Sequence, residues 1–394
     1  MKLKSAFALF LVFYSLSIFA TPNPQTVYFN NAAQQEGDGS LLHPYRFGED
    51  IPHAIKQAGE NGTLSIDYGT GEPYLLPQTL ALLPGQKIIG TGIKHPTLCG
   101  TIQLIYNNTL AHFNLLNKKN GGPNGIEGKD LKEITLDDLQ IGTRDAQSSG
   151  AFPYGIYFDM SGAGTLHNHI RIVNSTVIAA DAKSRPGTIG ITIGEEYDDV
   201  AIENTTGEGI QVNSLPDVQT NVMGILSRGD HTTIVNCHGI ATLTGAVSGE
   251  VTGLKIEGNF LSLSSSSGIA NTALMGPSND VFTIGVSYGN SEHALFNNLT
   301  AITNVKNGSV MNTSNAVQMI LARDVTINNG SLRTTGIPGR ALFLDSDSEI
   351  TINGSNKSQG VIQVGNQKTN LATIRGFGDR IILHNGEKWE FPSR

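Results

Sequence analysis

The sequence predicts an all-β fold, a parallel β-helix in which each coil contributes three short strands. One alternating phrase recurs along the chain and closes on a turn residue, as in HIRIVN, DVAIEN and DVTINN. Self-similarity at a nearly fixed period is typical of a repeat architecture. The copies lie 23 to 39 residues apart and end at Asn174, Asn204, Asn236, Asn259, Asn298, Asn329 and Gly354.

A second alternating phrase precedes most copies of the first and supplies another strand of the coil. Examples are GIYFD, IGITIG and FTIGVS, in which alternate positions are large and aliphatic. We expect these positions to fill the interior, because successive side chains of a strand point to opposite faces. They include Ile156 with Phe158, Ile191 with Ile193, and Ile284 with Val286.

The turn residue predicts a sharp corner in each coil, followed by a third, weaker strand such as STVIAA. Asn tolerates left-handed backbone and can hydrogen-bond the equivalent turn of the next coil. Two variable loops complete the predicted coil. The composition agrees, because 46 glycines and only 15% charged residues describe many short strands and turns.

The two ends of the chain predict export and capping. Lys2 and Lys4 precede an uncharged apolar run, which indicates a signal peptide over residues 1–20. We therefore expect a periplasmic, extracellular or surface-associated protein. Residues 21–92 are expected to form an N-terminal cap and the first coils. Residues 93–394 would form the remaining β-helix, with loop insertions and a C-terminal cap.

A short helix is predicted within this N-terminal cap. Ile51, Ala54, Ile55 and Ala58 follow helical spacing, and Gly59 provides a stop. A solenoid needs such an element over the open apolar end of its first coil. At the other end, the segment KWEFPSR is expected to cover the last coil.

Phrases of the N-terminal region resemble the opening coils of pectin-lyase-like, right-handed parallel β-helix proteins. These phrases are DGSLLHPY, IPHAIKQA, IDYGTGEPY and GQKIIGTG. The resemblance implies a right-handed β-helix over nearly the whole mature chain. It also implies a site along one outer face, because enzymes of this superfamily usually work there. The catalytic motifs of pectate lyases and polygalacturonases are absent, so the resemblance selects no single activity.

Charge and cysteine content restrict the partners. A net charge of −8 argues against nucleic acid or an anionic membrane as the main partner. The single apolar run is too short for a membrane span. Cys99 and Cys237 are predicted to be free thiols, because about four coils separate them and a disulfide needs Cα atoms within ~7 Å. We expect a monomer.

Three successive coils offer the candidate site, because polar residues occupy matching positions there. Adjacent coils lie ~4.8 Å apart, so these side chains can share one groove. The predicted catalytic residues are Asp159, Arg185, Arg228 and His231. The predicted substrate-binding residues are Tyr157, Lys183 and Asp230. The predicted ligands of a Ca²⁺ ion are Glu195, Glu196, Asp198 and Asp199.

Several chemistries fit these residue types. Clustered carboxylates could hold Ca²⁺, which in turn would bind the carboxylate of an acidic sugar. Arg185, Lys183 or Arg228 could neutralise a uronate or act as the base in β-elimination, which requires a depressed pKa. Two carboxylates at a suitable separation could instead hydrolyse a glycosidic bond. The competing interpretation is that these acidic turns are simply solvated.

Two functional hypotheses follow. The first is an exported protein that binds an extended acidic polysaccharide along residues 157 to 231, with lyase-type cleavage as its catalytic version. The second is a non-catalytic secreted or surface adhesion module whose loops contact a host or matrix protein. A β-helix scaffold hosts both functions, so the site must decide between them.

Overall fold

The computed structural model describes most of the chain from residue 24 onward. The described residues are 24–76, 79–118, 121–159, 168–182, 187–195, 197–214, 219–245, 248–274, 281–306, 313–336, 339–344, 350–353, 357–359, 361–364, 367–369, 381–384 and 388–390. The predicted signal peptide, Lys183, Arg185, Glu196 and Phe391 lie outside them.

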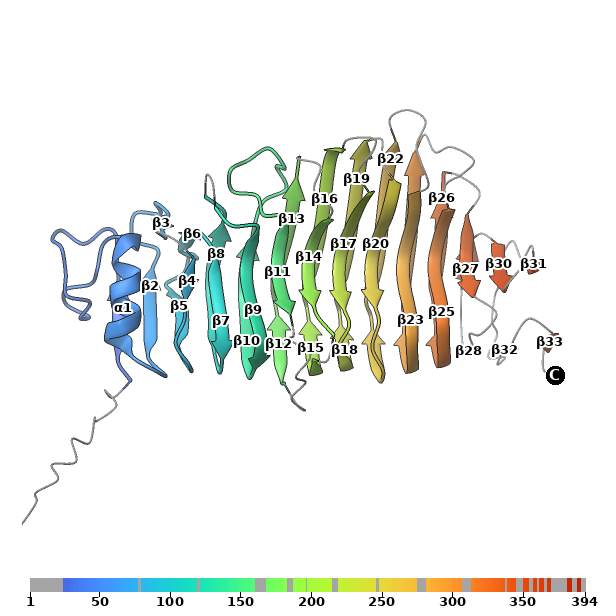
Figure 1. Ribbon diagram of the computed structural model, residues 1–394, viewed down its shortest axis with the longest axis horizontal. Coiled ribbons are helices and arrows are strands. Elements are labelled where there is room, and N and C mark those ends of the chain that lie inside the picture. The colour runs from blue at the N-terminus through green and yellow to red at the C-terminus, as the bar shows by residue number, and fades with distance from the viewer. Residues whose placement is uncertain are drawn as a thin grey trace, which may run out of the picture.

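The chain forms the right-handed parallel β-helix that the sequence predicted, with its strands stacked side by side along one axis (Figure 1). Three stacks of parallel strands make its walls. Stack 1 contains β4 (Leu80–Ala81), β7 (Ile102–Tyr106), β9 (Asn124–Lys132), β11 (Tyr154–Asp159), β14 (Gly187–Ile193), β17 (Gln219–Ser227), β20 (Ser248–Ile256), β27 (Arg340–Leu344), β30 (Val361–Val364) and the first halves of β23 (Val281–Asn297) and β25 (Thr313–Asn328).

Stack 2 is the narrow wall that follows stack 1 in each coil. It contains β1 (Thr26–Phe29), β2 (Thr63–Asp67), β5 (Lys87–Thr91), β12 (Ile170–Val173), β15 (Asp198–Glu203), β18 (Asp230–Val235), β21 (Leu261–Ser264), β28 (Ile350–Asn353), the first halves of β8 (Thr109–Leu116) and β10 (Ile134–Ile141), and the second halves of β23 and β25.

Stack 3 closes the coil. It contains β3 (Tyr74–Leu75), β6 (Thr97–Cys99), β13 (Thr176–Asp181), β16 (Thr206–Ser214), β19 (His238–Gly245), β22 (Ser267–Leu274), β24 (Thr300–Lys306), β26 (Ser331–Thr335), β29 (Lys357–Gln359) and the second halves of β8 and β10. Near the C-terminus the pairing becomes antiparallel, through β31 (Gln367–Thr369), β32 (Ile381–His384) and β33 (Lys388–Glu390).

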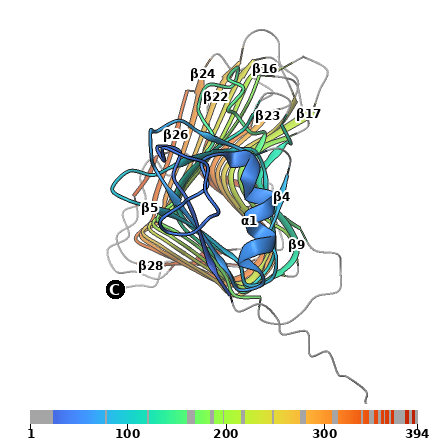
Figure 2. The same ribbon diagram turned by 90° about the vertical axis from the view of Figure 1, so that its left-hand side faces the viewer.

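The predicted capping helix is α1 (Ile51–Ala58), which follows a short 3₁₀ turn, η1 (Gly48–Asp50), and lies across the open end of the first coil (Figure 2). Its four predicted apolar residues are all buried. The buried Gln86 secures the end of the helix, because its amide donates to the carbonyls of Ile55 at 2.7 Å and Gly59 at 2.8 Å. Each of these carbonyls also accepts one backbone hydrogen bond, so the Gln86 amide takes up their second acceptor positions at the end of the helix.

Two rows of left-handed residues bracket stack 2. The first corner, which precedes stack 2, contains Glu133, His169, Asp199, His231, Phe260, His293 and Asp324. The second corner, which follows stack 2, contains His112, Asp138, Asn174, Asn204, Asn236, Ser265, Asn298 and Asn329. Every one of these residues has φ between 46° and 61°. The sequence predicted the second corner. It did not predict the first corner, where a variable loop was expected instead.

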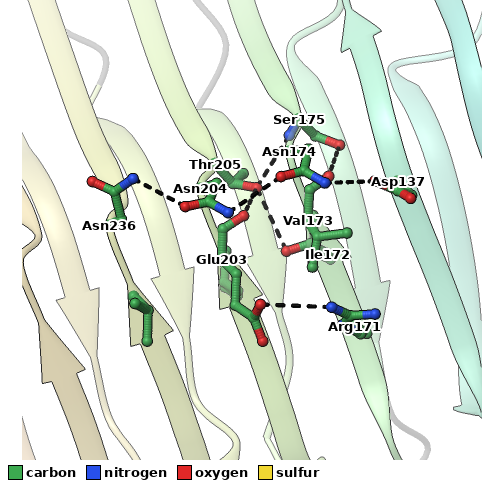
Figure 3. A network of polar contacts seen from close by, with 12 residues as sticks. Asp137, Arg171, Ile172, Val173, Asn174, Ser175, Glu203, Asn204, Thr205 and Asn236 are labelled. Atoms are coloured by element: carbon green, nitrogen blue, oxygen red, sulfur yellow. Dashed lines mark hydrogen bonds and ion pairs between the residues drawn. The ribbon is translucent and has the colours of Figure 1, made fainter.

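The Asn corner prediction is confirmed in the middle of the β-helix. The Asn236 amide donates to Asn204 at 3.0 Å, Asn204 donates to Asn174 at 3.2 Å, and Asn174 donates to Asp137 at 2.9 Å (Figure 3). This ladder joins four successive coils, because Asn204 and Asn174 each accept from one neighbour and donate to the next, and the Asp137 carboxylate accepts the last bond.

The corner predicted at Asn259 is wrong. β18 and β21 pair Thr233 with Ser262 and Val235 with Ser264, so Ser265 takes the place opposite Asn236. The segment LKIEGN alternates like a corner phrase, but its first half belongs to the end of β20 in stack 1. With Ser265 in the row, the intervals from Asn174 to Asn329 become 30, 32, 29, 33 and 31 residues.

Facing columns of small residues bring stacks 1 and 3 into backbone contact. The column in stack 1 contains Gly125, Gly155, Gly190, Gly224, Gly253 and Gly285. The column in stack 3 contains Gly207, Gly239 and Gly268. A Cβ on Gly224 would lie 2.2 Å from the backbone nitrogen of Ile240, and one on Gly268 would lie 2.2 Å from the carbonyl oxygen of Gly285. Only glycine allows this approach.

This contact divides the interior. The main core lies between all three stacks, and a smaller cluster of Val222, Ala241, Leu243, Val251, Ala270 and Val281 lies beyond the glycines, between stacks 1 and 3 alone. Figure 2 shows these two stacks continuing as two layers past the triangular coil. Buried hydroxyl pairs join the layers, including Thr272 with Thr283 at 2.9 Å and Thr303 with Ser314 at 2.6 Å.

The glycine column also shifts the alternation of stack 1. Ile156, Phe158, Ile191, Ile193 and Val286 fill the core as predicted. Ile284 pairs with Thr252 in the row of Ile189 and Met223, whose cluster is separate from the main core. Ile284 is buried as predicted, at 2% exposure, but it lies outside the main core because the strand changes its inward face at Gly285.

Both cysteines are free and buried, which confirms the prediction of two free thiols. The Cys237 thiol contacts the carbonyl oxygens of Ile202 and Val235, each at 3.2 Å. Burial raises the pKa of Cys237 to about 11, so the thiol is protonated at neutral pH and serves as a small core residue.

We expect Gly224→Ala to destabilise the protein by at least about 2 kcal/mol, because the new methyl group meets backbone that cannot rotate away. Thermal unfolding followed by circular dichroism measures the effect. Gly150→Ala is the matched control, since its Cβ would have no neighbour closer than 3.5 Å. Equal unfolding midpoints for the two variants would contradict a role for the glycine contact.

Candidate functional site

The predicted site residues that the structure describes lie at the end of stack 1 and along the first corner, whereas Lys183, Arg185 and Glu196 are outside the described residues. The β15 and β18 register places Asp198 opposite Asp230, and the same register places Asp199 opposite His231. The expectation that these coils align their polar residues is therefore met for this pair of strands. The alignment follows from parallel pairing, which repeats each position in the next coil.

Arg228 sits in a network of charges on the outer side of stack 1. Its Nε lies 2.8 Å from Glu257 Oε2, and its Nη1 lies 3.8 Å from Glu195 Oε1. Lys255 extends the network, with its Nζ 3.0 Å from Glu250 and 3.4 Å from Glu257. The arginine that was predicted to neutralise a uronate is thus paired with two carboxylates of the protein itself.

Lys255 is held in its charged form. Burial alone would lower its pKa, but the attraction and hydrogen bonds of Glu250 and Glu257 outweigh burial and raise the pKa above the ordinary lysine value. A lysine that acts as a general base needs the opposite shift. The network therefore stabilises the outer surface of β17 and β20 and does not supply a base.

His231 and Asp198 form the arrangement of an oriented base. His231 Nδ1 lies 2.6 Å from Asp198 Oδ1, and the Asp198 side chain is largely buried while the imidazole is exposed. A carboxylate at Nδ1 fixes the ring and leaves Nε2 as the nitrogen that could take up a proton. The predicted catalytic role of His231 thus has a positioning partner, which was predicted as a calcium ligand.

Other predicted residues have separate partners. Asp199 pairs with His169 of the preceding coil, so Asp198 and Asp199 are engaged from opposite directions. Asp230 accepts a hydrogen bond from the Asn259 backbone at 2.7 Å. Tyr157 packs edge-on against Tyr154, with ring centroids 5.6 Å apart. Asp159 ends β11, and its backbone carbonyl accepts from the Tyr197 hydroxyl at 2.7 Å.

The predicted calcium site stays a prediction. Glu196 is outside the described residues, and Glu195 reaches toward Arg228. Within the part of the chain that the structure describes, one group of three potential metal ligands has its ligand atoms close together. It consists of His95, His112 and Asp138. That group is far from the predicted set in sequence, and two of its members, His112 and Asp138, lie on the second corner.

The first corner also carries a stack of three rings, which the sequence did not reveal. His231 stacks on Phe260 with centroids 4.7 Å apart and planes at 2°, and Phe260 stacks on His293 at 5.0 Å and 18°. Phe260 remains 50% exposed. His293 Nδ1 lies 2.6 Å from Asp324 Oδ2, so a carboxylate holds each end of the stack.

An open recess of about 530 Å³ adjoins this ring stack. Apolar, amide, hydroxyl and charged groups of three neighbouring coils line it. The lining residues are Asn259, Phe260, Asn290, Ser291, Glu292, His293, Leu321 and Arg323. The chain thus combines an exposed aromatic surface with planar hydrogen-bonding groups, and this combination suits a ligand with one apolar face and several hydroxyl groups.

No family model matches the sequence, and no curated protein matches it. Similar solved structures include the A-module of a mannuronan C-5 epimerase from Azotobacter vinelandii. It is 12% identical, and the match covers 84% of this chain and 93% of that chain with a TM-score of 0.36. A PL6 alginate lyase in complex with a trisaccharide is 8% identical, with coverages of 93% and 91% and a TM-score of 0.38.

A third similar structure is the GH136 lacto-N-biosidase from Eubacterium ramulus. It is 10% identical, and the match covers 87% of this chain and 65% of that chain with a TM-score of 0.40. At these TM-scores the superpositions are partial, so the residues of this chain must carry any functional argument. Within the described residues, no helix has the length and apolar character needed to cross a membrane.

We expect Lys255→Met to destabilise the protein by roughly 2 kcal/mol at pH 7, because Glu250 and Glu257 lose their shared cation in a half-buried setting. The pH dependence has a definite sign. Because folding raises the pKa of Lys255, its stabilisation is present below the unfolded value of about 10.4 and is lost as pH rises through the folded value.

Thermal unfolding of wild type and Lys255→Met between pH 8 and pH 11 measures this difference. The wild-type midpoint should fall more steeply above pH 10 than that of the variant. Tyr197 and Tyr288 also titrate at alkaline pH but are common to both proteins. Lys129→Met, at an exposed position that ends the β9 and β11 pairing, is the control. Parallel curves for wild type and Lys255→Met would refute the assignment.

Proposed function

We propose that this protein binds an extended polysaccharide along the first corner, across the coils that carry His231, Phe260 and His293. The observation that carries the proposal is the half-exposed Phe260 ring beside an open recess lined by amide, hydroxyl and charged groups. An aromatic ring covers the C–H face of a sugar, while planar polar groups bond its hydroxyls. Export of the protein is part of this proposal, since polysaccharides of cell walls and matrices lie outside the cell.

The repeat of the coil matches a polymeric ligand. First-corner residues recur at the ~4.8 Å spacing of parallel strands, so a sugar chain running along the axis meets equivalent positions one after another. Carboxylates from Asp198, Asp199, Glu292 and Asp324 border the rings. An acidic glycan would therefore bind through Arg323 of the recess or through a bridging cation such as Ca²⁺, whereas a neutral glycan would need neither.

We expect Phe260→Asn to weaken polysaccharide binding roughly tenfold or more, because the lost ring contact is worth about 1.5–3 kcal/mol when covered. Asn keeps the left-handed backbone at this corner. Affinity electrophoresis against alginate, pectate, chondroitin sulfate and xylan, each with Ca²⁺ or EDTA, measures the effect. Phe282→Ala is the matched control, since Phe282 is 46% exposed and lies outside the recess.

The outcomes separate the possible ligands. Binding of alginate or pectate that EDTA abolishes indicates an acidic glycan held through calcium, and calcium-independent binding of xylan indicates a neutral one. Equal loss of affinity in Phe260→Asn and Phe282→Ala would place the ligand elsewhere. Absence of binding to every glycan would leave the adhesion hypothesis, in which the ligand is a host or matrix protein.

A second candidate function is cleavage of the bound glycan by β-elimination, and the His231 and Asp198 pair favours it. In this proposal His231 Nε2 removes the proton next to the uronate carboxyl group, the leaving glycosidic oxygen departs with the C–O bond electrons, and a double bond forms in the sugar. Asp198 fixes the ring through Nδ1. The alternative, plain binding, leaves the polymer intact.

We expect His231→Asn to abolish formation of unsaturated product while the fold is retained, because Asn preserves the corner backbone and lacks a titrating nitrogen. Ultraviolet absorbance of the unsaturated sugar, followed with alginate or pectate as substrate, measures the activity. His238→Asn is the control, since that imidazole bonds Ser267 at 2.7 Å on stack 3. Activity that survives His231→Asn excludes His231 as the base.

A further inference from the structure

The second corner changes its chemistry at the N-terminal end of the β-helix. In the middle coils the row consists of amides that bond one another, from Asn236 through Asn204 to Asn174, and the Asn174 amide donates in turn to Asp137, the residue before the corner of the preceding coil (Figure 3). One coil earlier the row continues with Asp138 and then His112, both in the left-handed conformation. A carboxylate and an imidazole replace the amides at positions where Asn would continue the ladder.

A third side chain completes the group. Asp138 Oδ2 lies 3.0 Å from His112 Nδ1 and 3.0 Å from His95 Nε2. The three potential ligand atoms all lie within 4.8 Å of one another. His95 comes from the turn before β6, so the three side chains belong to three separate segments of the chain.

We propose that His95, His112 and Asp138 bind a divalent transition metal ion of the zinc class. Two imidazoles and one carboxylate are the ligand types that Zn²⁺, Ni²⁺, Cu²⁺ and Co²⁺ prefer, whereas Ca²⁺ and Mg²⁺ take oxygen ligands. Zn–ligand bonds of about 2.0–2.1 Å in a tetrahedral arrangement place ligand atoms roughly 3.3 Å apart. The two separations from Asp138 are 3.0 Å and need only a small expansion, and the ligand nitrogens of the two imidazoles lie within 4.8 Å of each other.

Rigid backbone positions all three ligands. His112 and Asp138 are fixed by the corner and by the β8 and β10 register, in which Ala111 pairs with Asp137. The turn that carries His95 is anchored on β8, because the Asn114 backbone donates to the Pro96 carbonyl at 2.9 Å. A site whose ligands are held before the ion arrives loses little conformational entropy on binding.

The group is also open to solvent. The side chains are 25% exposed at His95, 48% at His112 and 41% at Asp138. Water can therefore reach the ion and complete its coordination, as at metal sites with three protein ligands. A bound ion would join the turn before β6 to β8 and β10, so it would stabilise the first coils of the β-helix.

Calorimetric titration of the full chain, without a polyhistidine tag, tests this site. With ZnCl₂ we expect saturable binding of one ion per chain and a raised unfolding midpoint, because a ligand that binds only the folded state stabilises it. CaCl₂ should bind at least tenfold more weakly. His112→Asn and Asp138→Asn should each lower the zinc affinity roughly 100-fold, since even residues that only support metal ligands are worth 10- to 100-fold.

The variants are chosen to keep the fold, because Asn is the residue that this corner carries in later coils. His95→Ala, in the turn outside both corner rows, should have the same effect by a separate route. His169→Asn is the matched control: His169 is also a left-handed corner histidine, 47% exposed and paired with a carboxylate, but among the described residues it does not belong to the group of converging ligand atoms.

The outcomes decide the proposal. Zinc binding that His95→Ala, His112→Asn and Asp138→Asn weaken and His169→Asn leaves unchanged supports the site. No saturable zinc binding, wild-type affinity in the three ligand variants, or loss of binding in His169→Asn would each overturn it. None of these results depends on polysaccharide binding at the first corner.

Discussion

The close approach of stacks 1 and 3 determines the rest of the structure. Where glycines face one another, the two walls meet backbone to backbone, and a Cβ on Gly239 would lie 2.3 Å from the Gly253 carbonyl oxygen. This contact closes the triangular core and opens a second, two-layered compartment beyond it. The glycines of stack 1 recur in every coil from β9 to β23 and those of stack 3 in β16, β19 and β22, so in these middle coils the walls cannot slide relative to each other without steric overlap. The register of the coils is fixed by shape as well as by hydrogen bonds.

A fixed register turns each corner into a row of stacked side chains. Every position is repeated at the strand spacing of ~4.8 Å, so the chemistry of a row depends only on which residues the sequence places there. Amides give a self-complementary ladder at Asn174, Asn204 and Asn236, since each side chain both donates and accepts. Imidazoles, carboxylates and a phenyl ring give the first corner a mixed surface. The same scaffold therefore presents two chemically different edges.

The strands could be predicted from the sequence because the same alternation of apolar and polar residues recurs in each coil. The corner prediction was wrong at Asn259, where the end of a stack 1 strand has the same pattern as a corner phrase. Asn259 ends a phrase that alternates like its neighbours, and only the pairing of β18 with β21 shows that Ser265 is the corner residue. The glycine columns were visible as a Gly in GIYFD, IGITIG and FTIGVS, yet their meaning depends on a facing strand some twenty residues away. Alternation alone cannot show on which face of the strand Ile284 lies.

The site was predictable only in part, for a related reason. Asp198 and His231 were found because they follow matching phrases in adjacent coils. Phe260 and His293 belong to the same row, but the residues around them do not match the repeated phrases. Nothing in the sequence around a single Phe shows that its ring is exposed. His95, His112 and Asp138 lie in early coils in which no phrase was recognised. Convergence of such residues is a property of the register and becomes visible only when the coils are stacked.

Charge pairing explains why this face does not resemble the substrate groove that its composition suggested. Arg228 was the natural partner for an acidic sugar, but it is bonded to Glu257 and approaches Glu195. A uronate would have to displace a carboxylate that is already in place, and the exchange of one anion for another has little driving force. Lys255 is likewise shared by two glutamates. If a glycan binds as proposed, its affinity comes from the rings and polar groups of the first corner, which include Arg323 in the recess, or from a cation that joins the carboxylates of protein and sugar. The charged residues at the end of stack 1 mainly bind one another.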